Sequence, residues 1–513
     1  MDVKEGEVLP MSPSSQYLKS SALSLTILAV LELQFPFDDS MFMSLLKEVF
    51  LPINPRFSSI MVTERKGVKK WKKVEVNLKD HVYTPIFPSN MSIEYYDECF
   101  TEYLSKVSME QLPQNRPFWE IHILKYPTKN AASNLIFKPH HSLGDGYSLM
   151  GALLSCVQRI DNPLMPLTFP SRQSCARPND NFPLFRWVPR FFTGVVHTAY
   201  DFGSSLFKST LVKDDKSPVR SGGQGVEFRP IVTITTTFCI DQIKQIKTSL
   251  KVSTLVKDDK SPVRSGGQGV EFRPIVTITT TFCIDQIKQI KTSLKVTIND
   301  VITGVIIFGT RLYMQKTREG SERARSTALV LLNTRAVQGY KSVDEMVKPG
   351  SKMPWGNRFA FLQVSMPRMT DEEQQNPLIF VKKPRRMIKR QRNSAAVYLT
   401  GQFLNLIRKI RGPEATARYI HGTLKNTSMA ISNMMGPVEQ MALANQPVKG
   451  LYFVVAGPPQ SLSVTMISYV GKLRIAVTVE KGFIDQNKLK SCIEYAFEVI
   501  YKAALESAPP TKS

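Results

Sequence analysis

The chain has few cysteines, carries no signal-peptide pattern and lacks a long apolar run. Its six cysteines show no CxxC spacing, which is typical of a reducing compartment and argues against a disulfide framework. Residues 1–7 include acidic side chains and do not have the charged-then-apolar pattern of a secretory signal. The most apolar stretches, residues 22–33 and 301–312, are shorter than the roughly 18 apolar residues of a membrane-spanning helix. We therefore expect a globular fold, and 513 residues are enough for two sizeable domains.

Acidic residues are also few relative to basic ones. The 67 Lys and Arg against 43 Asp and Glu give a formal net charge of +24. This favours anionic partners such as nucleic acid, an anionic membrane leaflet or a phosphate-bearing substrate. Two basic runs occupy residues 65–73 and 382–392, and no zinc-finger spacing, aromatic RNA-binding pattern or pair of basic helices accompanies them. We expect no nucleic-acid partner and interpret these runs as attraction toward a membrane surface or toward substrate phosphates.

The most informative motif is HHSLGDG at residues 140–146. Residues 133–138 before it have the pattern of a strand, and residues 147–160 after it have the small and apolar pattern of a buried helix. Because successive side chains of a strand point to opposite faces, His140 and His141 cannot share one role. One histidine is expected to face a cavity while the other packs behind it. The pattern therefore indicates a single general base with a supporting neighbour.

Two simpler interpretations of this motif compete with catalysis. Isolated His and Asp residues are usually structural, but the doubled His, the Asp-Gly pair and the strand-turn-helix setting together favour catalysis. A metal site is disfavoured because adjacent strand histidines diverge and no third ligand follows at a suitable spacing. Asp145 is placed to cap the helix that follows, and the glycines at 144 and 146 permit a tight, left-handed turn.

A second constellation lies at residues 297–300. Thr297 followed three residues later by Asp300 resembles a capping box at the start of the apolar helix 301–312. This places Asn299 in the first helical turn, among free N–H donors at the positive end of the helix dipole. Such a position favours developing negative charge, so Asn299 is a candidate for oxyanion stabilisation or substrate positioning. Plain helix capping by Thr297 and Asp300 is equally compatible with the pattern.

HHxxxDG is the active-site signature of the CoA-dependent acyltransferase superfamily, and the chain resembles the plant bifunctional wax ester synthase/diacylglycerol acyltransferase family within it. The resemblance covers nearly the whole chain in the family's order. The matching segments are residues 51–59, 116–120, 297–301, 431–437, 449–453, 468–469 and 485–486. Two departures are Phe118, where the family usually has Leu, and Gln446, where it usually has His.

The resemblance implies an α/β fold, an α+β sandwich of two chloramphenicol-acetyltransferase-like domains with an active-site tunnel between them. It implies acyl-CoA as donor and a long-chain alcohol or diacylglycerol as acceptor, giving wax esters or triacylglycerol by direct transfer that needs no cofactor. We expect a membrane-surface contact at the cytoplasmic face of the endoplasmic reticulum or at the plasma membrane. Another hydroxyl or amine acceptor on the same fold is an alternative.

The resemblance also implies roles for the motif residues. His141 is the expected general base, because imidazole has a suitable intrinsic pKa and proton transfer of this kind contributes about 10²- to 10⁴-fold. His140 would support the neighbouring backbone, Asp145 would fix the local geometry, and Gly146 would let the turn close. The family's Asn-Asp motif is tied to activity and matches Asn299 and Asp300. Structural roles are expected for three residues in other matching blocks: Arg335, Asn357 and Asn433.

A perfect tandem duplication interrupts the family pattern. Residues 209–252 recur without a change as residues 253–296, whereas solenoid repeats diverge and need at least three copies. A recent exon duplication or a gene-model error fits better. Each copy holds one β-branched run, and only one is expected to fill the strand position that the fold provides. We expect the second copy there, because it leads directly into residues 297–300, with the first copy lengthening a surface linker.

The predicted domain organisation follows from these assignments. Residues 1–180 form the N-terminal acyltransferase domain, residues 181–274 a linker with the first copy, and residues 275–513 the C-terminal domain. Within the linker, the aromatic-rich residues 182–207 are either an interdomain helix or an interfacial segment among lipid headgroups. If the duplication disables the enzyme, the chain would instead be an inactive, membrane-associated lipid-binding protein.

Overall fold

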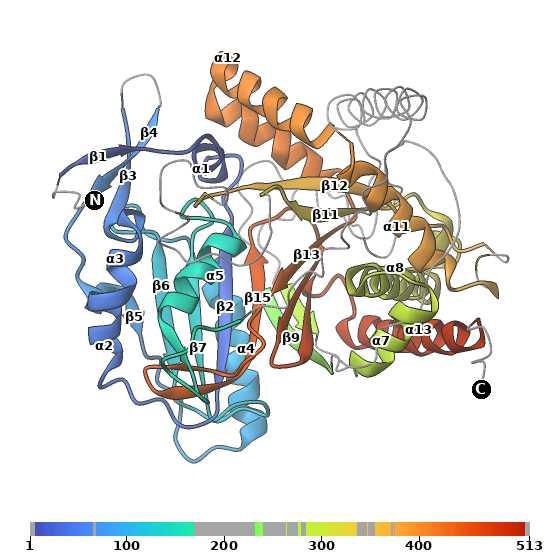
Figure 1. Ribbon diagram of the computed structural model, residues 1–513, viewed down its shortest axis with the longest axis horizontal. Coiled ribbons are helices and arrows are strands. Elements are labelled where there is room, and N and C mark those ends of the chain that lie inside the picture. The colour runs from blue at the N-terminus through green and yellow to red at the C-terminus, as the bar shows by residue number, and fades with distance from the viewer. Residues whose placement is uncertain are drawn as a thin grey trace, which may run out of the picture.

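Among the residues that it describes, the computed structural model has two seven-stranded sheets and a smaller three-stranded sheet (Figure 1). It describes residues 6–64, 68–168, 284–335, 354–370, 375–394 and 396–507, the backbone of 231–239 and 275–278, and the single positions 263, 346 and 373. The aromatic-rich segment 182–207 and most of the predicted linker lie outside the described residues. Each large sheet has its own apolar core, as expected for two domains.

The N-terminal sheet has the order β5-β6-β7-β2-β15-β14-β8. Its strands are β5 (Val82–Tyr83), β6 (Trp119–Leu124), β7 (Ser133–Pro139), β2 (Thr26–Leu33), β15 (Gln446–Ala456), β14 (Met441–Leu443) and β8 (Val157–Arg159). Every residue of β6 and β7 is buried, including polar side chains such as Glu120, His122 and Lys138, and Glu120 pairs with Lys138 at 3.1 Å. Strands β14 and β15 come from the C-terminal half of the chain, so residues 441–456 complete the sheet that carries the HHxxxDG motif.

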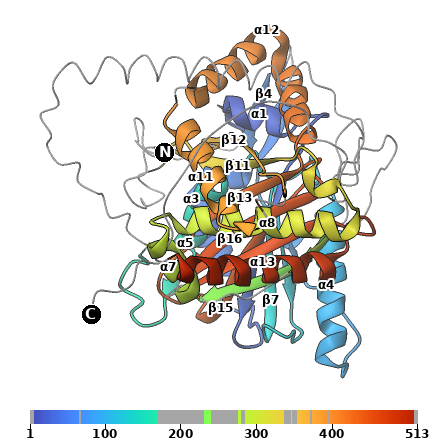
Figure 2. The ribbon, with the colours of Figure 1, turned by 90° about the vertical axis from the view of Figure 1, so that its right-hand side faces the viewer.

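The C-terminal sheet has the order β10-β9-β17-β16-β13-β11-β12. Its strands are β10 (Ile275–Ile278), β9 (Ile231–Cys239), β17 (Lys472–Glu480), β16 (Leu462–Tyr469), β13 (Met429–Met435), β11 (Thr327–Asn333) and β12 (Phe359–Ser365). Helices α8 (Ile298–Thr317), α11 (Ile379–Arg392) and α13 (Gln486–Glu506) pack in this domain (Figures 1 and 2). A Cβ at Gly309 of α8 would lie 2.7 Å from Ile493 Cα, so glycine permits the close approach of α8 and α13.

The remaining elements cover the sheets and their edges. They are α1 (Pro13–Leu18), α2 (Phe42–Leu45), α3 (Leu51–Ile53), α4 (Ile93–Met109), α5 (Gly146–Ser155), α7 (Ile284–Ser293), α12 (Ala396–Lys425), the π-helix Leu46–Phe50, the 3-10 helices Pro55–Ser58, Leu78–Asp80 and Ser321–Arg323, and the small sheet of β1 (Val8–Pro10), β4 (Lys69–Lys73) and β3 (Ser59–Thr63). Among the described helices, none alone has the length and apolar character of a membrane span. Gln286–Ser293 and Ile298–Thr317, bent by 103°, reach that length and character only as a pair.

Both copies of the duplicated segment contribute a strand to the C-terminal sheet. β9 of the first copy pairs with all of β17, from Ile231 opposite Glu480 to Cys239 opposite Lys472. β10 of the second copy places Ile275, the residue equivalent to Ile231, opposite the same Glu480. The prediction that only the second copy enters the sheet is therefore wrong. The physical reason is that two identical β-branched runs fit the edge of β17 equally well, so continuity with residues 297–300 does not exclude the first copy.

Candidate active site

The HHxxxDG motif forms the turn between β7 and α5. Asp145 is the N-cap of α5, and its side chain accepts a hydrogen bond of 3.0 Å from the Ser148 N–H, which confirms the predicted cap. The helix is shorter than the predicted 147–160, because it ends at Ser155 and residues 157–159 pair with β14 as β8. The motif thus lies at the end of a fully buried strand, where neighbouring strands hold the backbone in place.

His140 has both ring nitrogens engaged in a buried network. Nδ1 accepts a hydrogen bond of 3.0 Å from the Ser142 N–H, so the ring proton is on Nε2, which lies 2.9 Å from Ser24 Oγ. Burial and the positive charge of Lys19 lower the pKa of His140 well below its ordinary value. A histidine with both nitrogens committed is suited to supporting the backbone and is not free to exchange a proton with a substrate.

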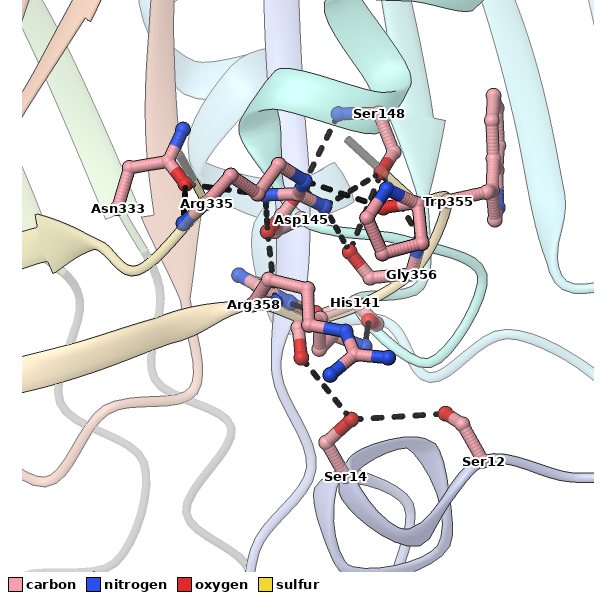
Figure 3. A network of polar contacts seen from close by, with 12 residues as sticks. Ser12, Ser14, His141, Asp145, Ser148, Asn333, Arg335, Trp355, Gly356 and Arg358 are labelled. Atoms are coloured by element: carbon pink, nitrogen blue, oxygen red, sulfur yellow. Dashed lines mark hydrogen bonds and ion pairs between the residues drawn. The ribbon is translucent and has the colours of Figure 1, made fainter. Parts of the chain in front are cut away.

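His141 has different surroundings, as the strand alternation predicted. Its Nδ1 lies 2.8 Å from Asn357 Oδ1, and Asn357 Nδ2 donates to the His141 carbonyl oxygen at 2.8 Å. Because the amide nitrogen is held by that carbonyl, Oδ1 faces the ring and Nδ1 must carry the proton. Nε2 is therefore the basic nitrogen, and no side chain among the described residues makes a hydrogen bond to it. Figure 3 shows His141 beside Arg358, which directly precedes β12.

The electrostatic environment keeps His141 neutral. The side chain is buried, with 6% of its surface exposed, and this burial lowers its pKa below the ordinary value. The charge of Asp145 and the hydrogen bond from the ring to Asn357 act in the opposite direction and limit the decrease. A neutral imidazole near pH 7 with an unpaired Nε2 is able to accept a proton.

Asp145 is held by an ion pair that joins the two domains (Figure 3). Arg335 Nη1 lies 2.7 Å from Asp145 Oδ2, and Arg335 Nη2 donates to Oδ1 at 3.1 Å. The Arg358 N–H donates to the same Oδ2 at 2.9 Å. These bonds, with the one from Ser148, use both oxygens of the Asp145 carboxylate. The geometric role that the resemblance implied for Asp145 stays a prediction.

The two motif glycines serve packing rather than a left-handed turn. Positive φ angles among the described glycines occur elsewhere, and neither Gly144 nor Gly146 has one. A Cβ at Gly146 would lie 2.3 Å from Met434 Sδ on β13, and a Cβ at Gly144 would lie 2.9 Å from Ser148 Cβ. The prediction of a left-handed turn is wrong, because the constraint on these positions comes from neighbouring side chains.

The residues at 297–300 form the predicted capping box. Asp300 N–H donates to Thr297 Oγ1 at 3.2 Å, and Thr297 N–H donates to Asp300 Oδ2 at 2.8 Å. Arg385 of α11 adds an ion pair of 3.4 Å to Asp300. Asn299 Oδ1 accepts a hydrogen bond of 3.1 Å from Asn433 Nδ2 on β13. Since Met434 of the same strand approaches Gly146, β13 connects this corner with the HHxxxDG turn, although no described hydrogen bond joins Asn299 to His141.

Asn357 is a residue whose contact with His141 the sequence did not predict. It was expected to be structural, yet it makes two hydrogen bonds to His141, from which it is separated by 216 positions. No spacing rule connects residues so distant in the chain, and only the packing of the two domains brings them together. Among the described residues, no group of three His, Cys, Asp or Glu side chains is arranged to hold a metal ion.

Comparisons with known proteins show what the chain is similar to. Residues 355–501 match the family described as the WS/DGAT C-terminal domain. The chain is 28% identical to wax ester synthase/diacylglycerol acyltransferase 4 of Arabidopsis thaliana, over 94% of this chain and 88% of that protein. It is 26% identical to number 11 of the same Arabidopsis series, over 97% of this chain and 95% of the relative.

Solved structures establish the fold. The wax ester synthase/diacylglycerol acyltransferase from Marinobacter aquaeolei VT8 superposes with a TM-score of 0.56 at 14% identity, covering 97% of this chain and 99% of the other. The starter condensation domain of rhizomide synthetase RzmA gives a TM-score of 0.52 at 9% identity, with coverage of 99% and 96%. The predicted two-domain α/β fold is confirmed. The chain is therefore similar to the wax ester synthase/diacylglycerol acyltransferases of Arabidopsis along nearly its whole length, and residues 355–501 match the C-terminal domain of that family.

Proposed function

We propose that the protein transfers a fatty acyl group from acyl-CoA to a long-chain alcohol, to diacylglycerol, or to both. The observation that carries this proposal is the state of His141. The residue is buried and neutral, its Nδ1 proton is committed to Asn357, and its Nε2 is left to accept a proton. The named activities of the Arabidopsis relatives supply the acceptors.

The proposed reaction is direct transfer in one site. His141 Nε2 takes the proton of the acceptor hydroxyl while the hydroxyl oxygen attacks the thioester carbonyl. The new C–O bond forms, the C–S bond breaks, and the proton passes from Nε2 to the departing CoA thiolate. During this transfer the ring is an imidazolium, and Asn357 Oδ1 continues to accept from Nδ1. The reaction needs no covalent enzyme intermediate and no cofactor.

The Asn299 corner is proposed to position the substrate or stabilise developing negative charge. Its Oδ1 is used by Asn433, so its own amide N–H groups stay directed elsewhere and are available to a carbonyl oxygen. Asp300 supports this arrangement through the capping box and Arg385. The predicted tunnel between the domains would have to bring the thioester within reach of both His141 and Asn299.

The cellular setting is proposed from charge and substrate chemistry. Long-chain alcohols and diacylglycerol reside in membranes, and a net charge of +24 favours an anionic cytoplasmic leaflet. We place the enzyme at the cytoplasmic face of the endoplasmic reticulum or at the plasma membrane. The phosphates of acyl-CoA are a second anionic partner for the same positive charge.

The test is product formation from labelled palmitoyl-CoA, with hexadecanol and diacylglycerol offered separately. Ester formed by the parent and lost in His141→Ala would support the proposal, and the product would name the acceptor. Folding of His141→Ala is checked by its circular dichroism and thermal transition. If the folded parent acylates neither acceptor but binds lipid, the chain is a lipid-binding protein and the enzyme proposal fails.

A further inference from the structure

Helix α12 consists of two helical segments that meet at a sharp bend. Gly412 interrupts the helix with φ of 81°, and Pro413 follows it. The bend separates residues 396–411 from residues 413–425. In both ribbon views α12 projects from one end of the molecule (Figures 1 and 2). The exposure of part of this helix to solvent calls for a physical explanation.

The second segment is anchored to the body of the protein. Ala417, Ile420 and Leu424 are buried in a small core that includes Leu18 of α1 and Leu329 of β11. At its start, the Glu414 carboxylate accepts hydrogen bonds from Ser21 N–H at 3.3 Å and from Ser21 Oγ at 2.9 Å. This half of α12 is therefore an integral part of the fold.

The first segment carries large apolar side chains that remain in solvent. Leu406 and Ile410 are 53% and 72% exposed, and their spacing of four residues places them on one helix face. Lys409 and Arg411, beside them in the sequence, are exposed as well. Exposed apolar residues flanked by cations are typical of helices that lie in a membrane interface, with apolar side chains among the acyl chains and cations at anionic headgroups. We call Leu406, Lys409, Ile410 and Arg411 the α12 tip.

We propose that the α12 tip docks the protein on an anionic lipid bilayer and that the lipid acceptor enters the active site from there. This deepens the proposed function and rests on it for the identity of the acceptor. Docking itself stands on the exposed residues and their charge, and it is measurable without turnover.

Apolar side chains lie between the tip region and the base. Leu404 of the exposed segment and Phe361 of β12 pack against the same small core. The rings of Phe361 and Phe359 lie 5.5 Å apart, and Phe359 lies 5.4 Å from the ring of His141. Both phenylalanines are only partly buried, on a strand at the edge of the sheet. These side chains would give a long-chain acceptor that leaves the bilayer at α12 apolar contacts on its way to His141.

A second basic element lies at the same end of the molecule. Strand β4, within the basic run 65–73, is close to α12 in both views (Figures 1 and 2), and Lys69 pairs with Glu414 at 3.7 Å. Lys70 is likewise paired, with Glu64 at 2.6 Å, so the exposed Lys72 is the β4 cation that would add to the attraction of the tip for an anionic surface. Each cation near such a surface contributes about fivefold to membrane partition.

The test is flotation of the full-length protein with vesicles. One set is phosphatidylcholine alone, and the other is equal parts of phosphatidylcholine and phosphatidylserine. The parent is expected to bind the second set more tightly. Leu406→Ser with Ile410→Ser should weaken that binding by about tenfold or more, and Lys409→Gln with Arg411→Gln by roughly 25-fold. The matched control is Leu505→Ser, an exposed leucine on α13 far from α12.

The outcomes separate docking from catalysis. The proposal would be overturned if binding did not depend on phosphatidylserine, or if the α12 variants bound vesicles as tightly as Leu505→Ser. The proposal would also be overturned if sedimentation showed that the parent self-associates and that the α12 variants do not, because a second copy would then cover the tip. With catalysis intact, Leu406→Ser with Ile410→Ser should lower turnover of hexadecanol in vesicles about tenfold relative to a dispersed short-chain alcohol. Tip-dependent binding by a parent that acylates neither alcohol would support docking and refute the proposed function.

Discussion

The contact between Asn357 and His141 gives the sharpest prediction. In Asn357→Ala, Nδ1 of His141 and the His141 carbonyl oxygen both lose their partner within a buried site. In the transition state the ring carries a positive charge, and a hydrogen bond to a charged group contributes about 1.5–3 kcal/mol. At 1.36 kcal/mol per factor of ten, the loss corresponds to about a 10-fold to 150-fold decrease in kcat. KM should change little, because Asn357 contacts the base rather than the substrate.

Asn357→Asp tests whether residue 357 acts by orienting the His141 ring or only by keeping the site folded. Its carboxylate can still accept from Nδ1, so kcat at alkaline pH should exceed that of Asn357→Ala. The added negative charge would raise the pKa of His141, and the acid limb of the pH–rate profile should move upward. The assay is initial-rate ester formation across pH for both variants, with thermal unfolding as the check on folding. Asn357→Ala with kcat within about twofold of the parent, or identical profiles for the two variants, would refute the reasoning.

Three further perturbations test the structural supports. Arg335→Met leaves the Asp145 carboxylate buried without its counterion and should lower the free energy of unfolding by about 3–5 kcal/mol, seen as a lower thermal midpoint. Lys490→Met, which removes an exposed ion pair with Glu494, should change the midpoint very little, and equal effects of the two variants would contradict this. Gly436→Ala would place a Cβ 2.2 Å from the Ser468 carbonyl oxygen and should destabilise the folded protein by about 1–3 kcal/mol. Gly422→Ala, whose Cβ would meet nothing within 4 Å, should not; an unchanged stability of Gly436→Ala would show that the backbone relaxes. Removing either copy of the 44-residue duplication produces the same shortened chain. This chain should keep its activity and aggregate less, because only one strand then matches the edge of β17. Loss of soluble protein would show that both copies are needed.

Local chemistry explains which features of the site could be predicted from the sequence. The different surroundings of His140 and His141 follow from strand alternation, and the caps at Asp145 and Thr297 follow from residues within three positions. The structure confirms those features, which could be predicted because each depends on a single helix or strand and its ends.

The features that could not be predicted depend on packing between distant segments. Asn357 reaches His141 across 216 positions, and Arg335 reaches Asp145 across 190. The constraint on Gly146 comes from Met434 in the other domain rather than from its own φ angle. The duplicated strand shows the same limit, since identical sequences give no basis for choosing between Ile231 and Ile275 at one edge of β17.

The central claim is that a buried, neutral His141 removes the proton from the acceptor hydroxyl, and the pH dependence of kcat/KM tests it most directly. Because burial lowers the pKa of His141, the base loses its function only as pH falls through a value below its ordinary 6.5 or so. With hexadecanol as acceptor, we predict an acid limb centred below about 6.5 in the parent and missing from the residual activity of His141→Ala. A limb centred above that value in the parent, or the same limb retained in His141→Ala, would contradict the assignment of His141 as the general base.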